Sequence, residues 1–203
     1  MATNVTTVPA RAGRIDPERL DPNKVGMIIF LIGEVVFFGS FIFAYANYRG
    51  RQAATGPTAD VLNIGLTGVF TVLLLSSSFT IWLAERNQRA GNRAGVALWL
   101  AATIALGAAF LVGQAFEWRE LIDEGITIRS GLFGTTFFTL TGFHGFHVFG
   151  GLVLLSILLW SSLAGWLRGR HSSALEAISL YWHFVDVVWI VVFSVVYLWE
   201  LIA

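Results

Sequence analysis

Five long apolar stretches, separated by short segments that carry most of the charge, dominate the hydropathy pattern of the chain. A transmembrane helix needs about 20 predominantly apolar residues, because each residue adds only about 1.5 Å along the helix axis. Every stretch meets that length, and the pattern therefore predicts an all-α membrane protein whose transmembrane domain covers residues 25–203. The predicted spans are Val25–Tyr48, Val61–Ala84, Gly95–Phe116, Leu132–Trp160 and Ala177–Trp199.

A transmembrane β-barrel is the competing architecture, and it would need segments of about ten residues with alternating polarity. Residues 61–84 show no such alternation and include no charged side chain, which favours helices. The composition agrees, since 56% of the residues are hydrophobic and 13% are charged, whereas soluble domains carry about 25% charged residues. Lys plus Arg equals Asp plus Glu at 13 each, so the net charge gives no reason to expect a nucleic-acid partner.

The polar residues 1–24 precede the first apolar stretch and are expected to form a cytoplasmic tail, because they lack the apolar region of a cleaved signal peptide. Lys and Arg are enriched in the cytoplasmic segments of membrane proteins. With the N-terminus inside, nine of the 13 Lys and Arg residues fall on inner segments and four on outer ones. The charge distribution therefore predicts a cytoplasmic N-terminus and an external C-terminus.

Ionisable side chains inside the predicted spans are the first candidates for function, because a charge at membrane depth is costly unless it is paired or hydrated. Helical rise places five of them near the middle of the membrane, on the first, fourth and fifth helices. Two further candidates lie at the end of the third span. The midplane residues are Glu34, His144, His147, His183 and Asp186, and the rim residues are Gln114 and Glu117.

Three interpretations of the midplane residues are open. They can form one packed layer of interhelical hydrogen bonds, in which Asp186 accepts from a neighbour and Glu34 lies within reach of a histidine on the fourth helix or of a lipid head group. Part of the layer can instead serve a lipid-linked or proton-linked role. A haem or metal site is the third possibility, because carboxylate and histidine ligands on facing helices bind di-iron in helical bundles.

Metal chemistry is restricted by the composition, since the chain has no cysteine and only four histidines. The di-iron bundles use several Glu residues together with Glu-x-x-His motifs, and the chain contains no such motif. We therefore expect no metal ligand set and no catalytic residue in this chain.

Small residues predict where the helices touch. Gly65 and Gly68 on the second helix, and Gly142 and Gly145 on the fourth, are expected to let neighbouring helices approach closely. The serines at 76–78 can bond back to their own helix, so we expect them to need no ligand.

Two long motifs resemble subunit III of the haem–copper terminal oxidases. They are Thr141–Val148, with the sequence TGFHGFHV, and Tyr181–Trp189, with the sequence YWHFVDVVW. Glu34–Phe38 resembles the Ser-Glu-Val-x-Phe-Phe stretch of that family, with Gly33 in place of the serine, and Gln114–Trp118 falls in family order. The resemblance runs from about residue 25 to the end and corresponds to the short, five-helix bacterial form.

The resemblance implies a non-redox subunit of a proton-pumping cytochrome c oxidase, which passes electrons from cytochrome c to dioxygen. Haem and copper would belong to subunits I and II, and this chain would carry no cofactor of its own. It would lie in the bacterial inner membrane as a multi-pass protein, flank subunit I, bind phospholipid and support proton uptake. The resemblance also implies that Glu34 corresponds to the buried carboxylate of the family.

Other functions compete with this interpretation. Subunit III of a quinol oxidase has similar motifs, but Glu34 and the Gln114-x-x-Glu117 pair favour the cytochrome c branch. The accessory subunit of nitric oxide reductases keeps only part of the helix-four motif. A small secondary transporter would commonly show inverted repeats or broken helices, and the sequence indicates neither.

Overall fold

The computed structural model describes residues 21–52, 62–167 and 173–198, and within them it contains five α-helices and no strand. All five helices are long and apolar enough to cross a membrane. The predicted all-α architecture of five transmembrane helices is therefore confirmed, while the predicted N-terminal tail lies largely outside the described residues. The helices are α1 Pro22–Gln52, α2 Ile64–Ala90, α3 Arg93–Asp123, α4 Leu132–Leu163 and α5 Ser173–Val196.

Local hydrogen bonds explain where two of the helices begin. Asn63 caps α2, because its side-chain oxygen accepts from the backbone N–H of Leu66 at 3.1 Å. Asn92 caps α3 in the same way, through the N–H of Gly95 at 3.1 Å. Between these helices the chain turns sharply at Gly91, whose positive φ of 74° suits a residue without a side chain.

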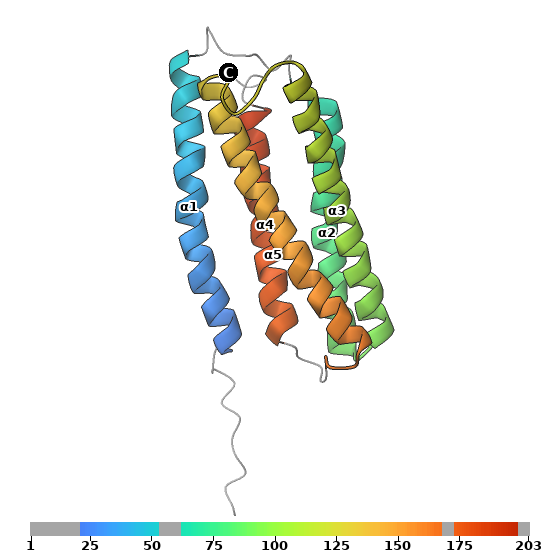
Figure 1. Cartoon of the computed structure of the whole chain (residues 1–203). Helices are drawn as coiled ribbons and strands as arrows, with labels where there is room; N and C mark the ends of the chain where they lie inside the picture. The colour runs from blue at the N-terminus through green and yellow to red at the C-terminus, as the bar shows by residue number, and fades with distance from the viewer. Residues whose placement is uncertain (1–20, 53–61, 168–172, 199–203) are drawn as a thin grey trace, which may run out of the picture.

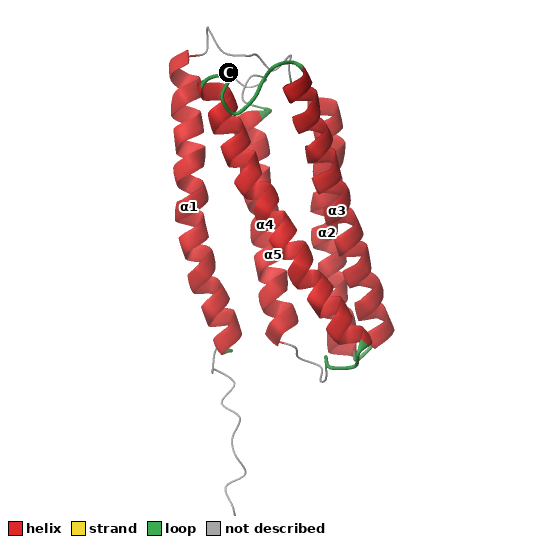
Figure 2. Cartoon of the chain, in the orientation of Figure 1, coloured by secondary structure: helices red, strands yellow, loops and turns green. Residues whose placement is uncertain are grey.

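The five helices form a bundle in which α4 and α5 occupy the middle (Figure 1). The α2–α3 hairpin packs along one side, where α3 contacts α4 and α2 contacts α5. On the other side, α1 contacts both α4 and α5. Among the described connections, the α2–α3 turn lies at one end of the bundle and the α3–α4 loop at the other (Figure 2). This arrangement leaves α1 at an edge, with one side toward the bundle and the rest of its surface uncovered.

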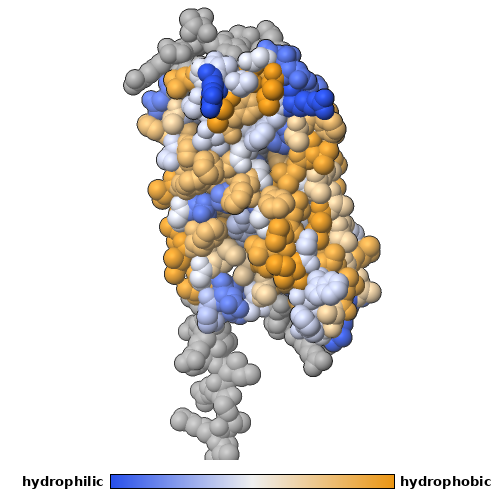
Figure 3. Space-filling view, viewed as in Figure 1, coloured by the Kyte–Doolittle hydropathy of each residue, from blue (hydrophilic) through white to orange (hydrophobic). Residues whose placement is uncertain are grey.

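Apolar side chains cover the middle of the bundle surface, and hydrophilic residues gather toward its ends (Figure 3). On α1 the exposed fractions reach 65% for Ile29, 71% for Val36 and 70% for Phe43. Such a surface is stable only in an apolar environment. The distribution agrees with a multi-pass membrane protein whose α1 faces lipid or another subunit.

Trp182 of α5 is fully buried, and it fills a gap that two glycines leave open. A Cβ atom added to Gly107 of α3 or Gly151 of α4 would come within 2.7 Å of the Trp182 ring. Its indole N–H donates to the Ser77 hydroxyl of α2 at 2.8 Å. One aromatic side chain thus joins four helices, and it depends on two glycines to do so.

The predicted glycine contacts on α2 are wrong. Among the described residues, no atom lies within 4 Å of a Cβ built on Gly68, and Gly65 meets only the side chain of its own cap, Asn63. On α4 the prediction is closer, because Gly142 faces Trp118 of α3 at 3.3 Å. Gly145 faces the Leu111 side chain of α3 at 3.8 Å, so both α4 glycines meet side chains and not the backbone of a neighbouring helix.

Candidate functional site

Glu34 and His147 bring α1 and α4 together. The Nε2 atom of His147 lies 3.1 Å from the Oε2 atom of Glu34, so the predicted contact between Glu34 and a helix-four histidine is confirmed. The other ring nitrogen, Nδ1, lies 2.7 Å from the carbonyl oxygen of Phe143. Because a carbonyl only accepts, Nδ1 carries a proton and donates it. A second proton is then shared between Nε2 and the Glu34 carboxyl group.

The Glu34–His147 pair is not sealed inside the bundle. Its side chains remain 18% and 12% exposed, respectively, among aromatic rings that include Phe37 and Phe38. On the inner side, the Tyr181 hydroxyl of α5 donates to the His147 carbonyl oxygen at 2.9 Å. The pair therefore remains partly accessible at the surface of the bundle.

Asp186 and His183 form a second cluster, between α5 and α2. The Ser78 hydroxyl donates to the Oδ2 atom of Asp186, and the Nδ1 atom of His183 lies 2.9 Å from the same hydroxyl. Asp186 is buried, with 3% of its surface exposed, as expected for a residue that accepts from a neighbour inside the membrane. The predicted interhelical hydrogen bond to Asp186 is confirmed.

Ser78 was expected to be able to bond back to its own helix, but it bonds across to α5. Its neighbours Ser76 and Ser77 do donate to carbonyl groups one turn earlier, at Val72 and Leu74. Ser78 instead faces α5 and supplies the link between His183 and Asp186. Ser77 also accepts from the indole N–H of Trp182, so both Ser77 and Ser78 link α2 to α5.

His144 is fully buried and has a different environment from the other midplane residues. Its ring stacks on Trp189 at a centroid distance of 4.8 Å and lies edge-on to Phe110 at 5.8 Å. Neither ring nitrogen has a hydrogen-bond partner among the described residues. The prediction of one hydrogen-bonded layer is therefore wrong. His144 and His147 point about 60° apart around α4, so one faces the bundle interior and the other faces α1.

Glu117 is the centre of a third cluster. It accepts hydrogen bonds from the Thr67 hydroxyl at 2.7 Å, the Gln114 amide at 2.9 Å and the Tyr197 hydroxyl at 2.7 Å. The sequence placed Glu117 at the rim of the third span, but α3 continues to Asp123 and the side chain is only 2% exposed. Thr67 and Tyr197 escaped the sequence analysis, because hydroxyl side chains in membrane helices are common and usually bond locally.

The chemistry available in these clusters is hydrogen bonding and proton exchange. Within the described residues, no three His, Cys, Asp or Glu side chains are grouped as a metal site would require. The clusters instead pair a carboxyl group with hydroxyl, amide or imidazole groups of neighbouring helices. The functional roles of Glu34, His144, His147, His183, Asp186, Gln114 and Glu117 remain predictions.

Together the fold and these clusters define a multi-pass helical membrane protein with polar contacts between its helices. The family model described as cytochrome c oxidase subunit III matches residues 13–201. The chain belongs to this family, as its motifs indicated. It is thus subunit III of a haem–copper oxidase and part of a multi-subunit oxidase complex.

Bacterial proteins with the same name cover most of the chain. The "Cytochrome c oxidase subunit 3" of Synechocystis sp. is 41% identical over 180 residues, which are 88% of this chain and 76% of the relative. The protein of that name from Corynebacterium diphtheriae is 38% identical over 177 residues, 86% of each chain. The "Probable cytochrome c oxidase subunit 3" of Mycobacterium tuberculosis is 33% identical over 198 residues, 97% of each chain.

Proposed function

We propose that this chain supports a cytochrome c oxidase of a bacterial inner membrane without taking part in its electron transfer. It flanks subunit I, binds phospholipid along its apolar surface and sustains proton uptake by the complex. Haem and copper lie in subunits I and II, where dioxygen is reduced. The bacterial relatives named cytochrome c oxidase subunit 3 support this location and favour cytochrome c over quinol as the electron donor.

The Glu34–His147 contact is the observation that carries the proposal. The two side chains form a hydrogen bond with each other between α1 and α4, at 3.1 Å. Their partial exposure also places an exchangeable proton at the apolar surface of the bundle. A pair of this kind can fix α1 in place and hold a proton near a partner subunit or a lipid head group, both of which are supporting roles.

Comparison of the oxidase with and without this chain tests the proposal. The complex is purified from cells that carry or lack the gene, and its reduced-minus-oxidised spectrum, initial turnover and loss of activity during prolonged turnover are measured. We expect the same spectrum and a similar initial rate in both, with faster loss of activity and slower proton uptake when the chain is missing. A missing haem or copper signal would contradict the proposal, provided that subunits I and II are present in normal amounts.

A further inference from the structure

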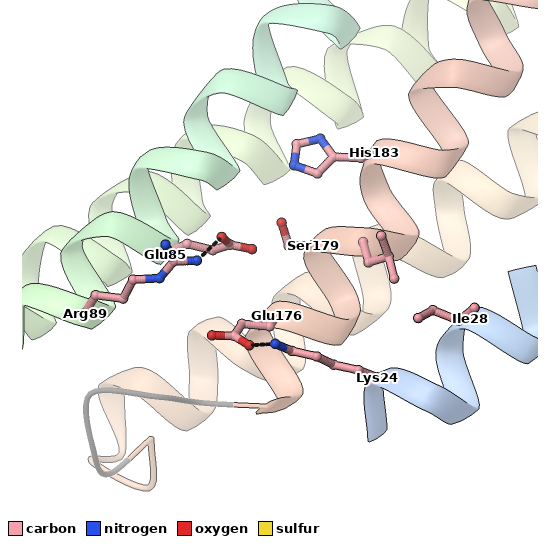
Figure 4. Close-up of a pocket in the computed structure, with 8 residues that line it drawn as sticks. Lys24, Ile28, Glu85, Arg89, Glu176, Ser179 and His183 are labelled. Atoms are coloured by element: carbon pink, nitrogen blue, oxygen red, sulfur yellow. Dashed lines mark hydrogen bonds and ion pairs between the residues drawn. The ribbon is translucent and has the colours of Figure 1, made fainter. Parts of the chain in front are cut away.

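A polar pocket of about 330 Å³ opens at the end of the bundle where α1 and α5 begin and α2 ends (Figure 4). Four of its side chains carry opposite charges and form two pairs: Arg89 with Glu85 at 3.1 Å, and Lys24 with Glu176. The positive and negative groups are balanced, so the pocket favours a neutral, hydrogen-bonding occupant over a strong anion. By volume it can hold about ten water molecules. Its remaining lining residues are Ile28, Ser179, Leu180 and His183.

Ser179 indicates what the pocket contains. The residue is 1% exposed, and its hydroxyl has no hydrogen-bond partner among the described residues. The hydroxyl points into the space between α5 and α2, beside Glu85 (Figure 4). A buried hydroxyl left without a partner costs about 1–3 kcal/mol, and a bound water molecule removes that cost. The geometry therefore points to water in the inner part of the pocket.

His183 connects the pocket to Asp186. Its ring lines the inner end of the pocket, one helical turn beyond Ser179, and its Nδ1 atom lies 2.9 Å from the Ser78 hydroxyl. Ser78 has one hydroxyl proton, and it donates this proton to Asp186. Ser78 must then accept from Nδ1–H of His183, which leaves the Nε2 atom as an acceptor. The three groups form a relay in which every hydrogen bond runs in the same direction.

We propose that this pocket is a hydrated inlet through which the Asp186 carboxyl group exchanges protons with the aqueous phase at the membrane face where α1 begins. A proton from pocket water binds Nε2 of His183, the Nδ1 proton moves to the Ser78 oxygen, and the Ser78 proton moves to Oδ2 of an ionised Asp186. The net result is one proton added to Asp186 and a change of tautomer at His183, and the reverse sequence restores both.

The charged groups at the mouth suit this role. Lys24 on α1, Glu85 and Arg89 on α2, and Glu176 on α5 face the route to His183 from all three helices that form the pocket. These charged groups keep the mouth polar and hydrated, and the pairing of cations with carboxylates prevents a net charge from building up there. The inlet goes beyond the supporting role proposed above, and its readouts do not require turnover.

Thiol labelling tests whether the inlet contains water. The chain has no cysteine, so Ser179→Cys introduces a single thiol that can be followed on this subunit within the intact oxidase in liposomes. We expect a charged, membrane-impermeant methanethiosulfonate reagent to modify Cys at this position at least about a hundredfold faster than in Val185→Cys, because a charged reagent needs water to reach its target. Val185 lies on the same helix and is equally buried, at 1% exposed, but it does not line the pocket. Equal rates in the two variants would overturn the hydrated pocket. Protection in liposomes that is lost in detergent would also overturn it, in favour of a lipid head group as the occupant.

Proton exchange at Asp186 tests the relay itself. Infrared spectra of the oxidase are recorded over a range of pH, and the Asp186 carboxyl band is identified as the one that disappears in Asp186→Asn. The rate at which this band shifts after transfer to heavy water then measures proton exchange at Asp186. We expect Ser78→Ala to slow this exchange at least about tenfold, while the control Ser76→Ala, whose hydroxyl bonds only to Val72 of its own helix, leaves it unchanged. The inference fails if Ser78→Ala exchanges as fast as the unmodified protein, or if no Asp186 band appears at any pH.

Discussion

Each of the three carboxyl groups that lie inside the helices has partners on a neighbouring helix, and the number of partners differs. Glu34 has one imidazole, Asp186 has one hydroxyl that is shared with His183, and Glu117 accepts three hydrogen bonds. Removal of a buried partner costs about 1–3 kcal/mol when it leaves the other group unsatisfied. The consequences of substitution should therefore depend on how many partners remain.

At Glu34, we expect Glu34→Ala to leave the oxidase spectrum unchanged but to slow proton uptake modestly or to hasten inactivation during turnover, because Nε2 of His147 loses its partner. Glu34→Gln keeps a side chain that can bond to His147 and should have the smaller effect. Val35→Ala is the matched control, since Val35 is 59% exposed on the same helix. Absence of the first turnover in fully assembled Glu34→Ala oxidase would show that this chain carries part of the chemistry.

At Glu117, Tyr197→Phe removes one of three donors and should lower stability by only about 1 kcal/mol. Glu117→Ala leaves Thr67, Gln114 and Tyr197 without their shared acceptor and should cost more. In the Glu117→Ala background, Tyr197→Phe should have little further effect, because the interaction is already lost. Thermal inactivation of the purified complex measures all three variants, and additive effects of the two substitutions would disprove the shared site.

At the scale of the helices, the sequence predicted their number, their approximate bounds and a contact between Glu34 and a histidine of the fourth helix. It did not predict which of the two histidines makes that contact or which way each helix faces. Helical rise sets the depth of a residue, so Glu34 and His147 could be placed at one level. Rotation is set by an apolar stripe in soluble proteins, whereas membrane helices are apolar on every side. The link from Ser78 to α5 was missed for this reason, and the expected contacts of Gly65 and Gly68 were wrong for the same reason.

Helix packing around Trp182 gives a prediction at this scale. Gly107→Ala and Gly151→Ala each place a methyl group against the Trp182 ring, and overpacking of this kind typically costs about 1–3 kcal/mol. Gly68→Ala is the matched control, because its added methyl meets open space among the described residues and improves helix propensity by about 0.5–1 kcal/mol. The thermal midpoint of the subunit in detergent should fall for the first two variants only. A fall of the same size in all three would refute the packing role.

At the scale of the whole molecule, the orientation in the membrane follows from the Arg and Lys distribution and remains a prediction. Reporter fusions after Arg51 and after Arg129 should read as external, since both positions follow helices that cross outward from a cytoplasmic N-terminus. A fusion after Arg89 lies in the opposite set of loops and should read as cytoplasmic. The reverse pattern at all three positions would invert the model and would move the inlet beside Lys24 to the external face.

Within the subunit, α5 packs against three other helices, α1, α2 and α4. Asp186→Ala removes the acceptor of the Ser78 hydroxyl and leaves Ser78 with His183 as its remaining partner. A loss of about 1–3 kcal/mol is expected, which is enough to loosen α5 against α2 without removing any redox centre. We therefore predict that Asp186→Ala lowers retention of this subunit during purification of the oxidase.

Two further variants separate loss of attachment from loss of chemistry. Asp186→Asn keeps an oxygen that can accept from Ser78, so retention should be close to normal. Val187→Ala changes a neighbouring side chain that is 57% exposed, and it should have no effect on retention. Retention is measured as the ratio of this subunit to subunit I on a gel, and the first-turnover rate is measured on the same sample. Because the cluster stabilises helix packing, the rate per assembled complex should stay near that of the unmodified oxidase even where retention falls. Normal retention in Asp186→Ala together with a lost first turnover would reverse this assignment and make Asp186 part of the oxidase chemistry.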